Sequence, residues 1–288
     1  MKCLVSGGLG FIGSNLVDLL IEEGHQVTIL DDLSTGKLAN YNEKAELVIG
    51  DIKDIQIFND LEPVEYVFHL AALARIQPSI EDPVTAHATN LTGTLNVLEF
   101  CKKVGAKIIF SGSSSIYAGT ELPTQEESEL DPKNPYALQK LQCEQYIQLY
   151  GELYDLDYTI LRYFNVYGEH QILDGAYAAV VGIFLDQKQR GVPLTITNDG
   201  EQRRDMTYVK DVARANVLAM NWPRSIFNIG TGKNYSMNEL ADFVGGEKAY
   251  IGERRGEARE TLANNSRALA HGWNYTVDIK DWITKCVQ

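Results

Sequence analysis

The sequence predicts an α/β fold in which a doubly wound parallel sheet is followed by a smaller α/β part. Through the first half of the chain, apolar runs of strand length alternate with segments of helical period. A glycine-rich turn follows the first run, and the second run ends in two aspartates. Strands and helices that alternate in this way form parallel sheets with helices on both faces.

The first half contains the regular elements. Cys3 to Val5 is expected to be a buried strand, and Phe11 to Glu23 a helix that Gly24 ends. Further strands are expected over Gln26 to Leu30, Leu47 to Ile49, Tyr66 to Leu70, Lys107 to Phe110 and Tyr158 to Leu161, with helices over Thr85 to Val104 and Ala137 to Leu153.

The second half is less regular, with longer loops and recurring Gly and Pro. Within it, Ile226 to Ile229 again has the pattern of a buried strand and is expected to return to the sheet. We therefore expect a first domain over residues 1–164, with a returning segment near 206–230. A smaller domain is expected over residues 165–288.

Composition excludes several classes of protein. The chain has 288 residues, 44% of them hydrophobic, and a formal net charge of -13. That charge disfavours nucleic acids and anionic membranes as partners, although a few local Arg residues could still hold a small anion. The four cysteines are scattered, which predicts free thiols and no metal site. No signal peptide or membrane span is evident, so we expect a soluble cytoplasmic protein.

A turn with glycines at three-residue intervals joins the first strand to the first helix. Gly7, Gly10 and Gly13 let backbone N–H groups approach a pyrophosphate at the positive end of that helix. The alternative is a tight turn without a ligand. The pattern becomes more specific because an acidic residue follows the second strand.

That acidic residue is Asp31, with Asp32 beside it. A carboxylate here would accept two ribose hydroxyls and would repel a 2′-phosphate, which favours NAD over NADP. After the third strand, Asp51 and Ile52 are placed to flank an adenine, and Asp51 could equally cap a helix.

Tyr136 and Lys140 form the most informative pair in the chain. Side chains four residues apart lie on one face of a helix, so the ammonium can lie beside the phenol. A free tyrosine has a pKa of about 10. A nearby positive charge favours the phenolate, which makes the pair a usable general base at neutral pH.

With these features in place, the chain resembles the NAD-dependent nucleotide-sugar epimerases and dehydratases, an extended branch of the short-chain dehydrogenases/reductases. The matching segments extend over nearly its whole length. They are Gly7 to Gly13, Asp31, Asp51-Ile52, His69 to Ala72, Ser113 to Tyr117, Tyr136 to Lys140, Arg162 to Gly168, Arg204-Asp205, Tyr208 to Asp211 and Asn228 to Gly230.

This resemblance implies a Rossmann-like domain that holds NAD and a small C-terminal domain that holds a UDP-sugar. Tyr136 would remove the proton from the sugar O4, Ser113 would bind O4, and Lys140 would hold the nicotinamide ribose and lower the pKa of Tyr136. The implied NAD contacts are Gly7, Gly10, Phe11, Ile12, Gly13, Asp31, Asp32, Asp51, Ile52, Leu70, Ala71, Ala72, Asn90, Tyr136, Lys140 and Tyr163.

Three reactions could follow oxidation at C4. Dehydration needs an acidic pair after the catalytic serine, and Ser114 and Ser115 stand there instead. Decarboxylation needs a uronate and a cation for its carboxylate, a role for which Arg75 or Arg203 could serve. Epimerisation needs no further catalytic group, only room for the keto sugar to turn.

The resemblance also implies the substrate. Asp174 to Val180 is similar to a run in bacterial 4-epimerases of UDP-N-acetylhexosamines, and Thr261 falls where a small residue admits the N-acetyl group. UDP-GlcNAc and UDP-GalNAc are therefore expected, together with UDP-glucose and UDP-galactose. Implied substrate contacts are Asn165, Ala178, Val180, Arg204, Arg254, Glu257, Arg259 and Thr261.

Two other interpretations stay open. The chain could be a uronate decarboxylase or epimerase of the same fold, or an NAD-binding sensor without activity. Ala118 and the pair Glu169-His170 depart from the family pattern and leave the substrate less certain. The family usually forms homodimers through two long helices, here Thr85 to Val104 and Ala137 to Leu153.

Overall fold

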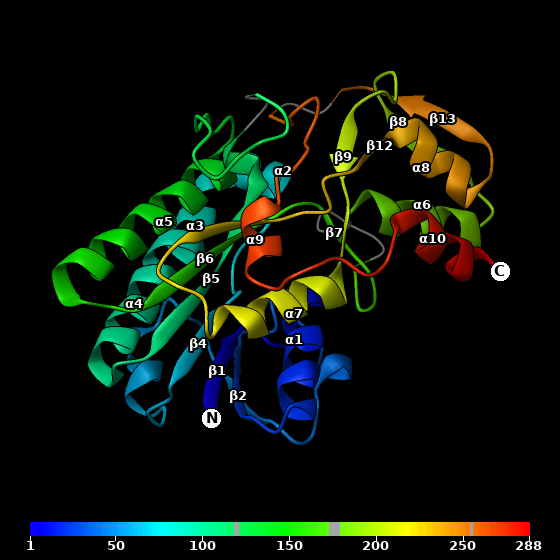
Figure 1. Ribbon diagram of the computed structural model, residues 1–288. Coiled ribbons are helices and arrows are strands. Elements are labelled where there is room, and N and C mark those ends of the chain that lie inside the picture. The colour runs from blue at the N-terminus through cyan, green and yellow to red at the C-terminus, as the bar shows by residue number, and fades with distance from the viewer. Residues whose placement is uncertain (118–120, 173–178, 254–255) are drawn as a thin grey trace.

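A seven-stranded parallel sheet forms the centre of the molecule (Figure 1). The computed structural model describes residues 1–117, 121–172, 179–253 and 256–288. The strand order is β11-β6-β5-β4-β1-β2-β3, which confirms the predicted doubly wound fold. The bounds are β1 Lys2–Ser6, β2 Gln26–Asp31, β3 Glu46–Ile49, β4 Tyr66–His69, β5 Lys107–Ser113, β6 Tyr158–Tyr163 and β11 Ile226–Ile229.

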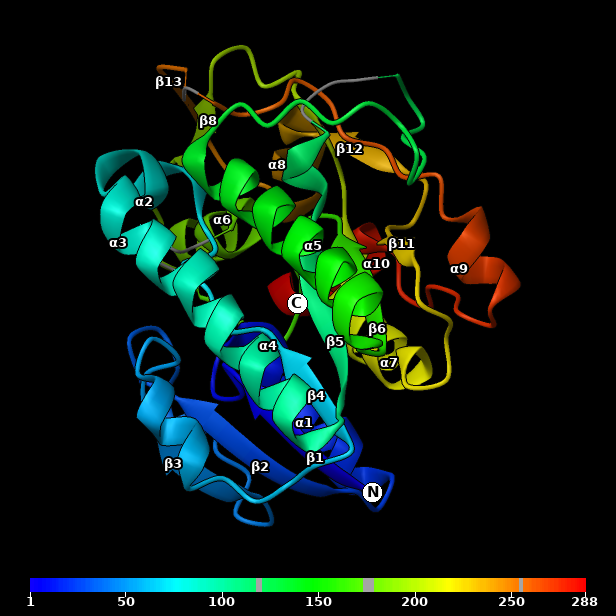
Figure 2. The same ribbon diagram turned by 90° about the vertical axis from the view of Figure 1, so that its left-hand side faces the viewer.

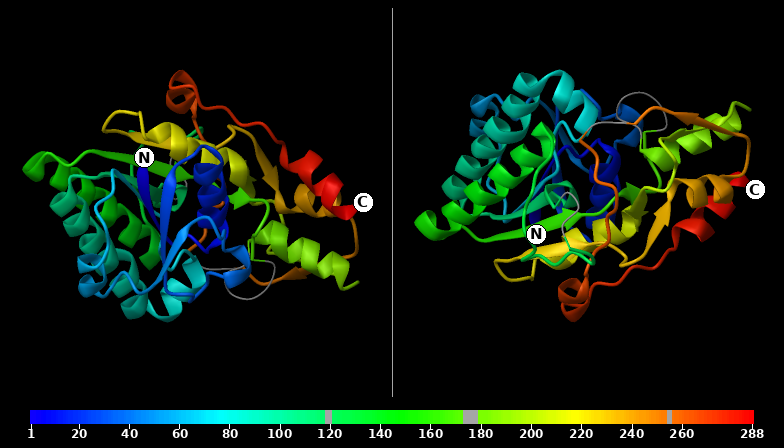
Figure 3. Two further views of the ribbon diagram at one scale, coloured as in Figure 1. Left: turned by 90° about the horizontal axis from the view of Figure 1, so that it is seen from below. Right: turned by 90° about the horizontal axis from the view of Figure 1, so that it is seen from above.

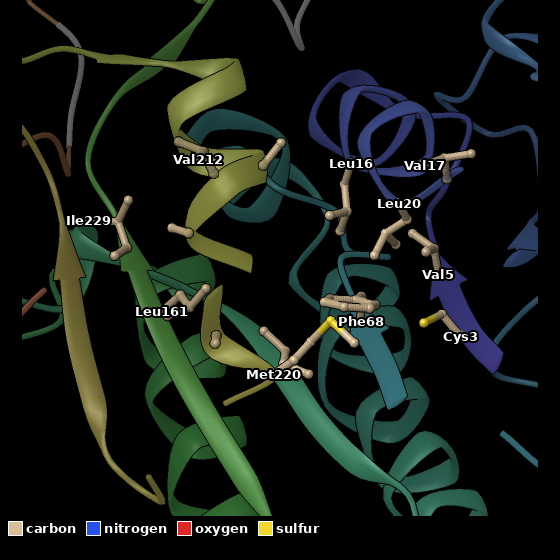
Figure 4. Close-up of a cluster of buried hydrophobic side chains, with 14 of the residues drawn as sticks. Cys3, Val5, Leu16, Val17, Leu20, Phe68, Leu161, Val212, Met220 and Ile229 are labelled. Carbon is tan, nitrogen blue, oxygen red and sulfur yellow. The ribbon is translucent and has the colours of Figure 1, made fainter. Parts of the chain in front are cut away.

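Helices cover both faces of this sheet. Helices α1 (Phe11–Glu22) and α7 (Val209–Ala219) pack together on one face, and α4 (Gly93–Val104) and α5 (Pro135–Tyr154) lie on the other (Figure 2). Each face buries its own apolar cluster. Side chains of α1 and α7, including Leu16, Leu20 and Val212, meet Phe68 and Leu161 of the strands (Figure 4).

The predicted elements of the first half are present, with shifts at their ends. Strand β5 continues three residues past the expected end, so that Ser113 is its last residue. The expected helix Thr85 to Val104 divides into α3 (Pro83–His87), a π-helical turn (Ala88–Thr92) and α4. Apolar periodicity alone cannot show a π turn, because one extra residue in a turn barely disturbs the helical stripe.

The chain returns to the sheet after leaving it, as the apolar run at 226–229 predicted. β11 pairs in parallel with β6, from Ile226 opposite Ile160 to Ile229 opposite Tyr163. Helix α7 precedes β11 and lies against α1. Residues from the second half of the chain therefore supply one edge strand of the central sheet and one of the two helices on its α1 face.

The rest of the second half forms a smaller α/β part beside the carboxyl ends of the strands (Figure 3). Its apolar cluster, which includes Phe184, Ile196, Leu240 and Ile283, is separate from the two clusters on the sheet. Its elements are β7 (Val166–Tyr167), α6 (Val180–Gln189), β8 (Leu194–Thr197), β9 (Arg203–Asp205), β10 (Thr207–Tyr208), β12 (Asn234–Ser236), α8 (Met237–Val244), β13 (Lys248–Ile251) and α10 (Ile279–Val287). Helix α9 (Ser266–Ala270) instead contacts β11, and its Ala268 belongs to the apolar cluster between the sheet and helices α1 and α7.

Short strand pairs hold this part together. β7 pairs with β10 and β8 with β13 in parallel, and β9 pairs with β12 in antiparallel orientation. The remaining short helices are α2 (Ile76–Glu81) and the 3-10 turns Leu38–Asn40, Ile55–Asn59 and Ser114–Ile116. None of the helices in the described ranges combines the length and apolar character needed to cross a bilayer.

Candidate active site

A cavity of about 550 Å³ lies between the carboxyl ends of the sheet strands and the smaller part. Ligands of doubly wound sheets bind at this edge, where the strand order reverses. Here the reversal falls between β1 and β4. The cavity runs from Asp31 at one end, past Ser113 and Tyr136, to Arg204 and Thr261 at the other.

The glycine turn forms the floor at the Asp31 end. A side chain at Gly13 would place its Cβ 2.0 Å from the Gly7 carbonyl oxygen, so only glycine allows this packing. Gly7 itself has φ +74°, and a Cβ there would lie 2.7 Å from the backbone nitrogen of Ala71. Gly7, Gly10, Phe11, Ile12 and Gly13, the expected NAD contacts of this turn, all line the cavity.

Asp31 lies at the end of β2, buried and facing the cavity. Its Oδ2 accepts a hydrogen bond from the Leu9 N–H and its Oδ1 one from the Leu33 N–H, both at 2.9 Å. Burial raises the pKa of this carboxyl, and the two backbone donors oppose that shift. Each oxygen keeps a further lone pair, so Asp31 can still accept two hydroxyl groups. Asp32 lines the same end.

Asp51 and Ile52 separate in the structure. Ile52 lines the cavity, whereas Asp51 is not among the lining residues. The Asp51 carboxylate accepts from the Lys53 N–H at 2.8 Å and pairs with the Lys53 ammonium at 3.2 Å. This supports the capping interpretation for Asp51, in a turn rather than at a helix start.

Leu70, Ala71 and Ala72 form the wall next to the glycine turn. Behind them, the buried His69 ring contacts Ser6 Oγ at 2.7 Å and Thr94 Oγ1 at 2.9 Å. Complete burial lowers the pKa of His69 to about 3, so the ring is neutral at physiological pH. This Ser6–His69–Thr94 network joins β1, β4 and α4 directly beneath the cavity.

Asn90 was expected to contact NAD, yet it is not among the residues that line the cavity. Its amide oxygen accepts from the Leu73 N–H at 2.8 Å, and its amide nitrogen donates to Gln139 Oε1 at 2.8 Å. Both the oxygen and the nitrogen of the Asn90 amide are therefore engaged in hydrogen bonds that hold the loop containing Leu73 from behind. A sequence motif cannot show this difference, because the same residue type suits either role.

The three predicted catalytic residues meet in the middle of the cavity. Ser113 ends β5, and its Oγ lies 2.8 Å from Ser115 Oγ and accepts from the Ser115 N–H at 3.2 Å. Tyr136 is in the first turn of α5, which Asn134 caps by accepting from the Ala137 N–H. Lys140 Nζ donates to the Ser111 carbonyl at 2.7 Å and lies 4.6 Å from the Phe110 ring centroid.

The electrostatics of this centre differ from the expectation. Burial raises the pKa of Tyr136 above 10, and the main opposing influences are a hydrogen bond with Ser113 and the positive charge of Arg75. Burial also lowers the pKa of Lys140 to about 8. The positive charge that lowers the pKa of Tyr136 is therefore that of Arg75. The helical spacing placed Lys140 on the correct face but could not show that a backbone carbonyl would hold its ammonium.

Some of the predicted substrate residues line the cavity, and the others lie outside it or outside the residues that the structure describes. Asn165, Val180, Arg204, Glu257 and Thr261 line the far end of the cavity. The Asn165 amide donates to Thr261 Oγ1 at 3.1 Å, and the Arg204 guanidinium lies 3.4 Å from the Glu257 carboxylate. Tyr163, a predicted NAD contact, also lines the cavity and donates to Asn216 Oδ1 at 2.9 Å.

Arg259 does not belong to this end. Its guanidinium pairs with the Asp199 carboxylate at 2.7 and 2.8 Å on the surface, and it does not line the cavity. Arg203 likewise pairs with Glu239 at 2.8 Å and lies outside. The Arg259 guanidinium is thus engaged with Asp199, and its diphosphate role stays a prediction. Ala178 and Arg254 lie outside the residues that the structure describes.

With this geometry established, comparison with known proteins identifies the family. The sequence profile of the NAD-dependent epimerase/dehydratase family matches residues 3–230. This chain belongs to that family. Membership confirms the family predicted from the motifs and NAD as its cofactor.

Named relatives and solved structures agree with this family assignment. The UDP-glucose 4-epimerase of Mycolicibacterium smegmatis is 36% identical, over 100% of this chain and 98% of its own length. The UDP-glucuronate 4-epimerase of Thermodesulfobacterium geofontis is 32% identical over 99% and 94%.

Among solved structures, the UDP-glucose 4-epimerase of Thermotoga maritima with UDP-glucose has a TM-score of 0.96 and 38% identity, covering 100% of this chain and 97% of that one. A UDP-N-acetylglucosamine 4-epimerase from Methanobrevibacter ruminantium in complex with UDP-N-acetylmuramic acid gives 0.93 and 36%, covering 99% and 96%. The chain is thus an enzyme of the nucleotide-sugar epimerase family.

The residues present fit the cofactor of this family. The turn around Gly7 and Gly13 leaves no space for side chains, which opens the helix N-terminus to a pyrophosphate. Asp31 would hold the adenosine ribose, and Lys140 and Tyr136 also line the cavity.

Sequence reasoning missed the residues that support the site from outside. The buried carboxylate of Asp205 accepts bonds from the N–H groups of Thr231, Gly232 and Ala263 at 2.8 to 3.0 Å. It thereby ties β9 to the loops that carry Thr261. In the sequence, the Arg204-Asp205 pair of the family pattern pointed to Asp205. Its hydrogen-bond partners, Thr231, Gly232 and Ala263, are seen only in the fold.

Proposed function

We propose that this enzyme is a UDP-hexose 4-epimerase that interconverts UDP-GlcNAc and UDP-GalNAc and also accepts UDP-glucose and UDP-galactose. One observation carries the proposal. Ser113 and Tyr136 lie in the middle of a single cavity that has a dinucleotide turn at one end and Arg204, Glu257 and Thr261 at the other. A nucleotide sugar that enters from the Arg204 end would bring its hexose to Tyr136.

The chain's own residues would then move the proton. The Tyr136 phenolate accepts the proton of the sugar O4, and the Ser113 hydroxyl, held by the Ser115 N–H, orients that oxygen. Bound NAD supplies the acceptor and donor of hydride at C4. The 4-keto sugar turns within the cavity, and Tyr136 returns the proton to O4 after the opposite face is reduced.

The residues beside Ser113 argue against dehydration. Ser114 and Ser115 line the cavity where a carboxyl pair would be required for water loss. The carboxylates among the described lining residues are Asp31 and Asp32 at the dinucleotide end and Glu257 beside Arg204. Epimerisation, which needs no such pair, fits this lining best.

The far end of the cavity favours an N-acetyl sugar. Thr261 is small, and its hydroxyl accepts from the Asn165 amide and the Asp205 N–H, which holds it against the wall. A bulky side chain in this place would fill the space that an acetamido group needs. Arg204 provides a charge-assisted hydrogen-bond donor for a diphosphate.

A uronate substrate is the second candidate, and Arg75 favours it. Of the two arginines considered for a sugar carboxylate, Arg75 lines the cavity and Arg203 does not. The relative from Thermodesulfobacterium geofontis is named for this activity. Turnover of UDP-glucuronate but not UDP-GlcNAc would select this candidate.

We also propose the domain division, the assembly and the location of the enzyme. Residues 1–164 with the return near 206–230 would bind NAD, and residues 165–288 the UDP-sugar. Helix α5 exposes Leu138, Leu149 and Leu153, an apolar face that a second copy of the chain would cover in a homodimer. The free buried thiols of Cys3, Cys101 and Cys143 suit the reducing cytoplasm.

Incubation of the purified protein with UDP-GlcNAc, without added cofactor, tests the main proposal. We expect UDP-GalNAc to form until both epimers are present at equilibrium, because the hydride returns to the same sugar. A product of altered mass would indicate decarboxylation or dehydration instead. Tight NAD binding with no turnover of any of the four UDP-hexoses or UDP-glucuronate would support an NAD-binding sensor.

A further inference from the structure

The predicted tyrosine–lysine pair leaves unexplained a half-buried arginine that lines the same cavity as the tyrosine. Arg75 lines the same cavity as Tyr136 and Ser113. Its charge and the Ser113 hydroxyl are the leading influences that favour the ionised phenol. Lys140 lines this cavity too, but its ammonium donates to the Ser111 carbonyl at 2.7 Å.

The fold places Arg75 at this point through a short helix. Arg75 has extended backbone (φ −144°, ψ 144°) immediately before α2 begins at Ile76. Helix α2 packs on α5, and the Tyr136 N–H donates to Ser79 Oγ at 3.1 Å. The Ser79 hydroxyl in turn donates to the Ile76 carbonyl at 2.7 Å. The start of α2 is thereby fixed to the first turn of α5, where Tyr136 lies.

We propose that Arg75 is a positioning residue for the reaction, a permanent cation in the cavity that stabilises the Tyr136 phenolate. The inference rests on the proposed function, in which Tyr136 is the base. Lys140 would then serve mainly to hold the nicotinamide ribose.

Two properties distinguish the two cations. An arginine keeps its charge at any pH that a folded protein tolerates. Lys140 is fully enclosed, and its pKa of about 8 means that it loses part of its charge above neutral pH. A phenolate that depended on Lys140 alone would lose its support as the pH rose. Arg75 removes that dependence.

Other titratable groups around Tyr136 do not supply this charge. Helix α5 contributes Cys143, which acts to raise the pKa of Tyr136. Glu144, on the same helix, is engaged with Arg162 at 2.7 Å. His69 on β4 is neutral. Arg75 therefore stands as the cation whose removal should be visible in the ionisation of Tyr136.

The test compares Arg75→Gln with Arg75→Lys and with a control, Arg190→Gln, in the NAD-loaded protein. Arg190 is exposed at the end of α6 and pairs with Asp186. We expect Arg75→Gln to move the acid limb of the kcat–pH profile upward by about one pH unit or more. Arg75→Lys should recover part of the shift, and Arg190→Gln should match the wild type.

A second readout needs no turnover. Ultraviolet absorbance of tyrosinate, taken as the difference between each protein and its Tyr136→Phe counterpart, reports the ionisation of Tyr136 alone. Its onset should move to higher pH in Arg75→Gln. An unchanged onset and an unchanged acid limb would overturn the inference, even if KM increased. If the wild type turned over no UDP-sugar, the proposed function would fail, and the absorbance difference would still decide the role of Arg75.

Discussion

The two ends of the cavity are built in different ways. At the dinucleotide end, the lining comes from the glycine turn and from residues that directly follow β2, β4 and β5. At the sugar end, Arg204 and Thr261 are brought together by pairing between segments far apart in the chain, including a bridge of Arg203 with Glu260. Sequence motifs identify the lining of the dinucleotide end well. The residues that follow parallel strands lie together at one edge of the sheet, so a motif after each strand locates them. The lining of the sugar end depends on long-range contacts.

A polar network supports each end, and the networks differ in charge. His69 beneath the dinucleotide end is neutral and contacts Ser6 and Thr94. Asp205 behind the sugar end is a carboxylate that accepts from Thr231, Gly232 and Ala263. The network beneath the dinucleotide end is therefore neutral, whereas the one behind the end where we propose that the sugar binds consists of charged hydrogen bonds.

The largest expected effect lies where the two ends meet. Tyr136→Phe removes the proton acceptor, so we expect kcat to fall by roughly 100- to 10 000-fold while NAD stays bound. Conversion of UDP-GlcNAc, followed by chromatography, measures the loss. The matched control is Tyr146→Phe, an exposed position on the same helix. Full activity in Tyr136→Phe would contradict the role of this residue.

Gly13→Ala tests the shape of the dinucleotide end. The new Cβ would lie 2.0 Å from the Gly7 carbonyl oxygen. Because backbone must move, we expect a loss of stability of about 3 kcal/mol or more and protein purified without NAD. Thermal unfolding and the nucleotide content measure both effects. Gly252→Ala, where a Cβ would meet nothing within 4 Å, should behave like the wild type.

Asp205→Asn tests the charged network at the sugar end. An amide group would direct its NH₂ at N–H donors that now meet a carboxylate oxygen, leaving buried donors unpaired. We expect a loss of about 3 kcal/mol in the free energy of unfolding and a raised KM for the UDP-sugar, with NAD affinity kept. Urea unfolding measures the free energy of unfolding, and enzyme kinetics measure KM for the UDP-sugar. Equal losses of NAD and sugar affinity would show that the ends are not independent.

Thr261→Tyr tests the space for an acetamido group. Overfilling the pocket by about 1–3 kcal/mol should lower kcat/KM for UDP-GlcNAc by roughly ten- to a hundredfold and leave UDP-glucose less affected. Thr261→Ser, which keeps the hydroxyl that Asn165 binds, is the control. If both substrates lose activity equally, Thr261 does not select between them.

The pH dependence of stability tests the neutral network at the dinucleotide end. The pKa of His69 is about 3 in the folded chain and 6.5 when unfolded. Below pH 6.5 the unfolded chain therefore binds a proton that the folded chain excludes, and stability falls by up to about 1.4 kcal/mol per pH unit. Urea unfolding at pH 6.5 and 5 should show a shallower fall in His69→Gln than in the wild type. Exposed His87→Gln should retain the wild-type slope.

Much of the site followed from the sequence where the chemistry is local. The glycine turn, Asp31, Ser113 and Tyr136, which the sequence singled out, all line the cavity. Other ligand contacts stay predictions, and they share one difficulty. Asn90, Asp51 and Arg259 have the correct residue types for ligand contacts, but each bonds to the protein itself. The partner of a polar side chain is a property of the neighbouring segments, which the motif does not contain.

The sequence by itself determined the order of strands and helices, the dinucleotide turn and the spacing of Tyr136 and Lys140, because these depend on backbone periodicity and on steric limits between nearby residues. Only the tertiary structure decided where the side chains of Lys140 and Arg75 lie. The Lys140 ammonium donates to the Ser111 carbonyl, and the packing of α2 on α5 places Arg75 at the cavity. Electrostatic interactions depend on distances in space. The distance between two side chains across a cavity cannot be derived from their spacing in the sequence.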